Sequence, residues 1–239
     1  MKKIAIIGAG ISGLFIANLF KRNTNYQISI YEKNNFISSE EGYGVQFSVN
    51  SVKLLNKIGF KKLENNQKFT PKTINFFSIK NLSKICELDI SKFNSEDCKY
   101  TTLKRSTLIN FLKSDLVDFI KTDHNISKIE QIDQKIRLSF ENCEIDECDY
   151  LIISDGVFSK SKSIITNNKI KPKYNKTLAI RGILTKSPKN VDNENISLFL
   201  GSIFHQVIDV VNANGELNFI AIMKYQLAPE VRKNLSVLF

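Results

Sequence analysis

Residues 4–32 read IAIIGAGISGLFIANLFKRNTNYQISIYE and combine two apolar runs with a glycine-rich turn and an amphipathic segment. The first run, residues 4–7, is typical of a strand that is buried on both faces. Residues 14–20 have helical spacing of their apolar side chains. Residues 28–31 predict a second strand, which ends at Glu32. This order of strand, turn, helix and strand predicts a βαβ unit.

The glycines of the turn have separate physical roles in binding a dinucleotide. Gly8 permits the tight turn from strand to helix, Gly10 lets backbone N–H groups approach a pyrophosphate, and Gly13 lets the helix lie close to the strand. The helix then begins at Ile11 and Ser12, where free backbone donors and a partial positive charge favour phosphate. The turn therefore predicts a diphosphate site.

Glu32 stands where the second strand ends, and a carboxylate there can accept hydrogen bonds from an adenosine ribose. The same charge disfavours a 2′-phosphate, so NADP is a poor candidate for this site. A glycine-rich turn alone is weak evidence. The strand before it, the helix after it and an acid at the right distance together predict dinucleotide binding, with FAD and NAD both open.

Composition excludes several other classes of protein. The net charge is +10, but the basic residues are mostly scattered lysines, whereas nucleic-acid sites cluster Arg and Lys on one face. The four cysteines form no Cys-x-x-Cys pair and the two histidines lie far apart, so no metal site is expected. Unpaired thiols favour the cytoplasm. Glycines interrupt the apolar N-terminus and no later segment is long and apolar enough to span a membrane, so neither export nor a membrane span is expected.

Four later segments carry further signals. Residues 42–51 read GYGVQFSVNS and precede an amphipathic helix that ends at Gly59. Residues 103–108 read LKRSTL and open a helix, for which Leu108, Leu112, Leu116 and Ile120 give an i, i+4 stripe. Residues 149–159 read DYLIISDGVFS, an apolar strand followed by an Asp-Gly turn. The last segment runs from Arg181 to Asn214-Gly215, which is a hairpin signal.

In this order, the segments resemble the aromatic-ring hydroxylases, which are single-component FAD-dependent monooxygenases typified by salicylate and p-hydroxybenzoate hydroxylases and include the ubiquinone-biosynthesis hydroxylases. The resemblance runs from Lys3 to about Ile222. It implies that Arg105 contacts FAD between its ribityl and pyrophosphate parts. It also implies that Asp155 and Gly156 belong to a motif associated with FAD and the nicotinamide donor, that Gln46 lies towards the flavin, and that the sheet from Thr177 to Met223 covers the substrate.

The expected site residues form two sets, with no metal ligand and no catalytic side chain, because the flavin carries the chemistry in this family. The cofactor-binding set is Gly8, Gly10, Ile11, Ser12, Gly13, Glu32, Lys33, Arg105, Asp155 and Gly156. The substrate-pocket set is Gln46, Arg181 and His205.

The sequence departs from the family pattern at three places. Ile153-Ser154 precede the Asp-Gly turn where the family has Gly-Ala. Lys162 stands near the position at which the family usually has Arg, and a lysine supplies the charge but not the two parallel hydrogen bonds of a guanidinium. Asp209-Val210 stand where relatives of salicylate hydroxylase carry Tyr-Pro. The family's second flavin motif, a Gly-Asp that starts a helix, is not reached before Phe239, which suggests an incomplete chain.

We therefore expect an α/β fold. A Rossmann-like FAD-binding domain with a parallel sheet comprises 1–72 and 101–170, a mostly antiparallel substrate-side sheet comprises 73–100 and 171–225, and 226–239 begin a truncated helix. The expected function is hydroxylation of an aromatic or quinone-precursor substrate with NADH or NADPH and O2; a homo-oligomer is left open. A non-oxygenating flavin oxidoreductase, an NAD-dependent dehydrogenase and an inactive remnant are the alternatives, although no catalytic set of a dehydrogenase is found.

Overall fold

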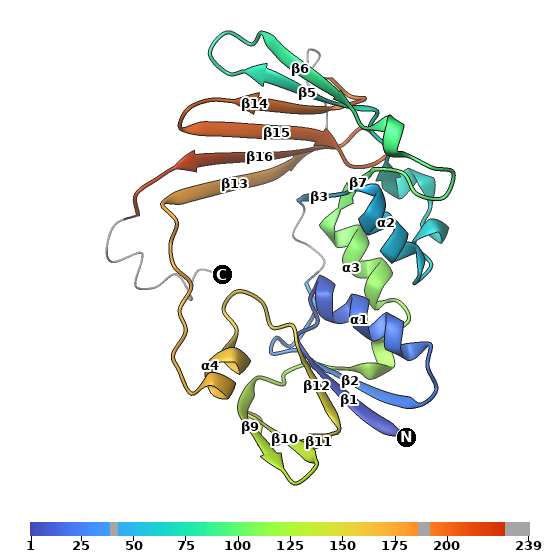
Figure 1. The fold of residues 1–239 in the computed structure, drawn as a ribbon, viewed down its shortest axis with the longest axis vertical. Helices are drawn as coiled ribbons and strands as arrows, with labels where there is room; N and C mark the ends of the chain where they lie inside the picture. Colours follow the sequence, from blue (N-terminus) through green and yellow to red (C-terminus); the bar gives the residue numbers. More distant parts are fainter. Residues whose placement is uncertain (39–42, 186–191, 228–239) are drawn as a thin grey trace. The chain divides into compact units, whose positions relative to one another are not determined.

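The computed structural model describes residues 1–38, 43–185 and 192–227 (Figure 1). The chain forms two compact units, each made of two separate segments. Unit 1 comprises Met1–Ser38 and Ile109–Lys173, and unit 2 comprises Ser39–Leu108 and Tyr174–Phe239. The domain boundaries expected from the sequence stay a prediction, and from residue 228 onwards the expected final helix lies outside the described residues.

Unit 1 is built on a four-stranded parallel sheet in the order β12-β1-β2-β8. Its strands are β1 (Lys2–Ile7), β2 (Tyr26–Tyr31), β8 (Ile120–Lys121) and β12 (Tyr150–Ile153). The helix α1 (Ile11–Lys21) connects β1 to β2 (Figure 1). Residues 4–7 of β1 are each at most 4% exposed, as expected for a strand between two neighbours with both faces covered. The predicted βαβ unit is confirmed.

A three-stranded antiparallel sheet packs against this parallel sheet. It consists of β9 (Ile126–Ile132), β10 (Lys135–Phe140) and β11 (Ile145–Cys148) in the order β11-β10-β9. The core between the two sheets includes Tyr31 and Phe140, whose rings stack with centroids 4.6 Å apart. Burial of each such side chain stabilises the fold by about 1.5–3 kcal/mol. The thiol of Cys148 lies in the same core, where burial raises its pKa to about 11.

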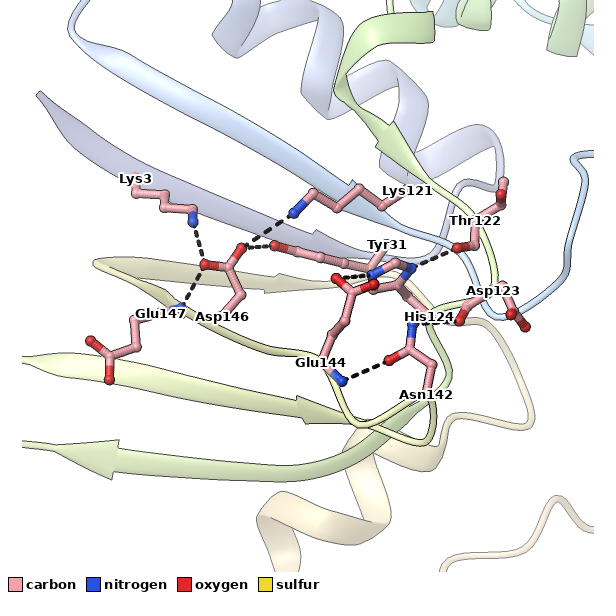
Figure 2. A network of polar contacts seen from close by, with 10 residues as sticks. All are labelled: Lys3, Tyr31, Lys121, Thr122, Asp123, His124, Asn142, Glu144, Asp146 and Glu147. Carbon is pink, nitrogen blue, oxygen red and sulfur yellow. Dashed lines mark hydrogen bonds and ion pairs between the residues drawn. The ribbon is translucent and has the colours of Figure 1, made fainter.

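A polar network reinforces this packing (Figure 2). The carboxylate of Asp146 on β11 accepts hydrogen bonds from Lys3 Nζ and from the Tyr31 hydroxyl, and Lys121 Nζ lies 3.9 Å away. Burial opposes ionisation of Asp146, but the hydrogen bonds from Lys3 and Tyr31 outweigh it and lower the pKa of the carboxyl. The network thereby joins β1, β2 and β8 to the antiparallel sheet.

Unit 2 contains a six-stranded sheet in the order β13-β16-β15-β14-β5-β6. Every neighbouring pair is antiparallel except β14 with β5, which confirms the mostly antiparallel sheet. The Asn214-Gly215 pair forms the predicted hairpin between β15 and β16, and Gly215 has φ +75°. The strands are β5 (Thr73–Ser78), β6 (Lys84–Asp89), β13 (Thr177–Leu184), β14 (Ile196–Leu200), β15 (Phe204–Val210) and β16 (Leu217–Lys224).

A smaller sheet in the order β3-β7-β4 completes unit 2. Its strands are β3 (Gly44–Phe47), β4 (Lys68–Phe69) and β7 (Thr101–Lys104), and the helix α2 (Val49–Asn56) follows β3. A Cβ added to Gly44 would lie 2.6 Å from Asn218 Cγ and 2.7 Å from Val211 Cγ1, so glycine lets β3 approach the residues of β16 and the end of β15. Short 3₁₀ turns lie at Phe60–Lys62, Asn65–Gln67, Ser91–Phe93 and Val117–Phe119.

The helix predicted after residue 103 begins as expected but is shorter. The helix α3 spans Arg105–Lys113 and therefore does not include the last two members of the expected stripe. Leu116 is fully buried ahead of a 3₁₀ turn, and Ile120 pairs with Ile30 in the parallel sheet. Burial of an apolar side chain gives the same sequence signal in a helix and in a strand, which explains the error. The remaining helix, α4, spans Lys160–Thr166.

Candidate functional site

The glycine turn has the geometry that its sequence predicts. Gly8 has φ +101°, and a Cβ there would lie 2.5 Å from the carbonyl oxygen of Ser154. A Cβ on Gly13 would lie 2.0 Å from the carbonyl oxygen of Gly8. At Gly10, by contrast, a Cβ would meet no atom of the described residues within 4 Å. Gly8 and Gly13 are therefore required by packing, whereas Gly10 borders open space.

The open space lies at the N-terminus of α1. Leu14 N–H donates to Gly10 O at 2.9 Å, and the amides of Ile11, Ser12 and Gly13 precede this first bond of the helix. No acidic side chain occupies the first turn, and Gly10 has no side chain that could cap it. Amides in this position, with the positive end of the helix dipole, suit an anionic diphosphate.

Glu32 lies next to the same turn. Its Oε2 accepts a hydrogen bond from Ala9 N–H at 3.0 Å, and its Oε1 accepts one from Asn34 N–H at 3.1 Å. The backbone of Glu32 is fixed by Lys121 O and His124 N–H, at 2.9 and 2.8 Å. A carboxylate has about four acceptor positions, so lone pairs remain for ribose hydroxyls. The next predicted residue, Lys33, is exposed.

His124 explains why the end of β2 is so well anchored. Its Nδ1 lies 2.6 Å from Thr122 O and its Nε2 lies 3.1 Å from Glu144 Oε2 (Figure 2). The ring also packs against Tyr31, with centroids 5.5 Å apart. The sequence showed only that this histidine lies far from His205, which argued against a metal site. The structure gives it the role of a side chain that holds the segment beside Glu32.

The departure from the family pattern at Ser154 has a local explanation. Its hydroxyl lies 2.9 Å from Ile7 O and 3.1 Å from Gly8 O and shares its proton between them. A Cβ on Gly13 would approach this hydroxyl to 2.7 Å. The side chain of Ser154 therefore fits because Gly13 has none, and it ties the end of β12 to the glycine turn.

The Asp-Gly turn borders a cavity of about 350 Å³ in unit 1. Asp155 Oδ2 accepts from Ser161 N–H at 3.0 Å, while its Oδ1 is buried with no hydrogen-bond partner in the described parts of the chain. Gly156 has φ +80°. An unpartnered buried oxygen fits a site that a bound ligand completes. The cavity is lined by Ile153, Ser154, Asp155, Gly156, Ser159, Lys162, Ile165 and Thr166.

The remaining predicted residues belong to unit 2. Strand register places Arg181 of β13 opposite Ile220, which is itself opposite Val207, and His205 opposite Ile222. Directly paired residues of an antiparallel sheet share a face. Arg181 and His205 therefore lie on one face of the six-stranded sheet, with half-buried apolar side chains between them.

Tyr43 joins Arg181 to Arg105. The guanidinium of Arg181 lies 4.9 Å from the centroid of the Tyr43 ring, and that of Arg105 lies 5.6 Å from it. The backbone N–H of Arg105 also donates to Tyr43 O at 2.8 Å. Two predicted site residues thus contact one aromatic ring, although sequence separates them widely.

Gln46 contacts the same sheet face through a residue that was not predicted. Its Nε2 donates to Asp209 Oδ1 at 3.1 Å, and Asn218 Nδ2 donates to the same oxygen at 2.8 Å. Asp209 is 0% exposed, and burial raises its pKa to about 6 although both hydrogen bonds lower it. Two signals pointed to it in the sequence: an acidic residue inside the apolar strand FHQVIDV, and the departure from the Tyr-Pro of the family at Asp209-Val210.

Across the described ranges, no group of three or more His, Cys, Asp or Glu side chains is placed to hold a metal ion. No described helix is both long and apolar enough to cross a membrane.

Comparisons with known proteins agree with this geometry. A family model described as an NAD(P)-binding Rossmann-like domain matches residues 6–45. The chain is 22% identical over 184 residues to 6-hydroxynicotinate 3-monooxygenase of Bordetella bronchiseptica. The aligned residues cover 76% of this chain and 47% of that protein.

Solved structures show the fold at low sequence identity. Klebsiella pneumoniae HpxO, complexed with FAD and uric acid, matches with a TM-score of 0.82 and 17% identity over 99% of this chain and 60% of HpxO. The 2,6-dihydroxypyridine-3-hydroxylase of Arthrobacter nicotinovorans matches with a TM-score of 0.78 and 18% identity over 95% of this chain and 57% of that enzyme. The chain thus spans about half the length of its curated relative and less than two thirds of these structures. It has the fold of the FAD-dependent aromatic hydroxylases, which its sequence resembles.

Proposed function

We propose that this protein binds FAD and hydroxylates an aromatic or quinone-precursor substrate, with NADH or NADPH as electron donor and O2 as oxidant. The observation that carries the proposal is the hydrogen bond from Ala9 N–H to the Glu32 carboxylate, because it sets a ribose acceptor beside the glycine turn of a parallel sheet. The free thiols of all four cysteines support a location in the cytoplasm.

In this proposal, the residues of unit 1 hold the adenosine diphosphate part. The amides of Ile11, Ser12 and Gly13 donate to the diphosphate, and Glu32 accepts from the ribose. FAD bound here would supply the redox chemistry: it would take two electrons from the nicotinamide, and one atom of O2 would go to the aromatic ring while the other would leave as water. The guanidinium of Arg105 suits the anionic linker, as the family resemblance implies.

Unit 2 offers a face for a flat substrate. Half-buried Val207, Ile220 and Ile222 provide apolar surface between Arg181 and His205. Apolar side chains with a few polar groups at the edges are typical of sites for small ring compounds. The names of the relatives mention hydroxynicotinate, dihydroxypyridine and uric acid, so hydroxylated or oxo nitrogen heterocycles join hydroxybenzoates as the first candidates.

Isotope labelling tests oxygen insertion. The full chain, saturated with FAD, is incubated with NADH or NADPH under ¹⁸O₂ and with each candidate ring compound, and products are analysed by mass spectrometry. The proposal expects one ¹⁸O atom in a hydroxylated product. Aromatic-dependent oxidation of NAD(P)H without any labelled product would favour the non-oxygenating flavin oxidoreductase, and a chain that binds no FAD would favour the inactive remnant.

A further inference from the structure

Asp209 is a buried acid that the nucleotide site does not explain. It lies on β15, on the sheet face that carries Arg181 and His205, and is 0% exposed. Its Oδ2 is buried with no hydrogen-bond partner within the described residues. An ionised carboxylate in such a place is costly, and burial accordingly raises the pKa of Asp209 to about 6. Both protonation states are therefore accessible near neutral pH.

One neighbour of this acid has a fixed orientation. Asn218 Oδ1 accepts from Gly44 N–H at 2.7 Å, and a backbone N–H can only donate. The amide nitrogen of Asn218 must therefore point the other way, towards Asp209 Oδ1 at 2.8 Å. Asn218 donates to Asp209 whether or not the acid is protonated.

Gln46 has no such constraint. Its Nε2 donates to Asp209 Oδ1 at 3.1 Å, and its Oε1 accepts from the Tyr100 hydroxyl at 3.0 Å. A carboxyl group and a hydroxyl group can each be donor or acceptor. The amide of Gln46 can therefore reverse and remain hydrogen-bonded at both ends, provided that its two neighbours change roles together.

The network thus has two hydrogen-bond patterns that differ by one proton, and in both the Gln46 amide is bonded at each end. With Asp209 ionised, Gln46 must donate to it, so the Tyr100 O–H donates to Gln46 Oε1 and the lone pairs of its oxygen are left to accept. With Asp209 protonated at Oδ1, the acid donates to a reversed Gln46, whose Nε2 then donates to Tyr100. The O–H of Tyr100 is then free to donate to another group.

We propose that Asp209 is a positioning residue that sets the hydrogen-bond polarity of the Tyr100 hydroxyl through the amide of Gln46. An ionised Asp209 makes Tyr100 an acceptor, which suits a ligand with an O–H or N–H donor, such as a neutral phenol or hydroxypyridine. A protonated Asp209 makes it a donor, which suits a phenolate or carboxylate. That this ligand is the aromatic substrate rests on the proposed function; the relay itself does not.

Other charged groups lie on the elements around Asp209. They are Arg181 on β13, His205 on β15, Lys104 on β7, Arg105 after it, Glu216 before β16 and Lys224 at the end of β16. Lys104 and Glu216 form an ion pair with each other, whereas hydrogen bonds connect Tyr100 to Asp209 through Gln46. Burial raises the pKa of Tyr100, and the charge of Asp209 raises it further, so the phenol stays protonated while Asp209 titrates.

Carbon NMR of the full chain tests the relay without a flavin or a substrate. Tyrosine labelled with ¹³C at Cζ reports the hydrogen bonding of each of the seven hydroxyls, and the Tyr100→Phe variant assigns the relevant signal. The Tyr100 signal should shift with an apparent pKa of about 6, while that of Tyr174, which donates to Tyr225 O at 2.6 Å, should not. The shift should vanish in Asp209→Asn and in Gln46→Met.

A Tyr100 signal that is constant between about pH 5 and 8, or one that titrates unchanged in Asp209→Asn, would overturn the relay. Asp209→Asn preserves the shape of the side chain, so the test does not depend on the less conservative Gln46 variant. Failure of the proposed function is separable: a chain that oxygenates no aromatic ring but shows the Asp209-dependent shift at Tyr100 retains the relay. An active enzyme should in addition lose the corresponding limb of its kcat/KM pH profile in Asp209→Asn.

Discussion

Replacing Asp209 by Asn should remove a loss of stability that the buried acid imposes on the wild-type protein as pH rises. The folded protein binds the Asp209 proton more tightly than the unfolded chain does, because the pKa is raised from 3.8 to about 6. Protonation therefore favours the fold, and the contribution of this residue to stability declines as pH rises through 4 to 6 and levels off above about pH 7. At about 1.4 kcal/mol per pH unit, the full decline is about 3 kcal/mol. Asparagine retains an oxygen acceptor for Gln46 and Asn218 but carries no charge.

The assay is urea denaturation of wild type and Asp209→Asn at a series of pH values from about 4 to 8. The free energy of unfolding of the variant minus that of wild type should increase with pH by roughly 2–3 kcal/mol, and most of the change should occur below about pH 7. The difference isolates Asp209, since all other titrating groups are shared. A difference that is independent of pH, or that decreases as pH rises, would refute the assignment of Asp209 as a buried acid with a raised pKa.

Three further substitutions test the parts of unit 1. Gly13→Ala should lower the free energy of unfolding by about 3 kcal/mol or more, because its methyl group would lie 2.0 Å from Gly8 O, and an unchanged melting temperature would contradict this packing. Tyr31→Phe should lower the free energy of unfolding by about 1.5–3 kcal/mol at neutral pH, because it removes a hydrogen-bond donor from the ionised Asp146. In urea denaturation, this loss should become smaller below pH 3.8, the ordinary pKa of the carboxyl, as acid protonates Asp146. Glu32→Gln should weaken the binding of ADP-ribose by at least about tenfold, and it should reduce the ratio of the affinity for ADP-ribose to that for 2′-phospho-ADP-ribose. Equal affinities of wild type and variant in calorimetry would argue against a ribose contact.

The nucleotide-binding half of the fold could be predicted because its signals are local. The glycine spacing, the flanking apolar runs and Glu32 all lie within residues 4–32, and each has a physical role that does not depend on distant residues. The Asp-Gly turn after β12 and the Asn-Gly hairpin were equally local. Their predicted positions agree with the strand bounds in the structure.

The polar network of unit 2 could not be predicted because it depends on strand register between distant segments. Gln46 and Asp209 are 163 residues apart, and no period or motif relates them. Ser154 likewise appears in the sequence only as a departure from the family pattern. The structure shows that its hydroxyl occupies space that is open because Gly13 has no side chain. The prediction of a helix through Ile120 was wrong because the local apolar pattern was helical, whereas Ile120 pairs with Ile30 in the parallel sheet.

The central claim is that the N-terminus of α1 binds the diphosphate of an adenosine dinucleotide, and Gly10 tests it most directly. An added methyl group meets no atom within 4 Å in the described part of the chain, so Gly10→Ala should alter stability by no more than about 1 kcal/mol while it obstructs the approach of a diphosphate. FAD is titrated into wild type, Gly10→Ala and, as a control on the same helix, Leu19→Ala, with flavin fluorescence as the signal and ADP as competitor. Wild type and the control should bind FAD alike and release it to ADP, and Gly10→Ala should bind at least about tenfold more weakly. Equal binding by a folded Gly10→Ala, or FAD binding that ADP does not displace, would contradict the claim.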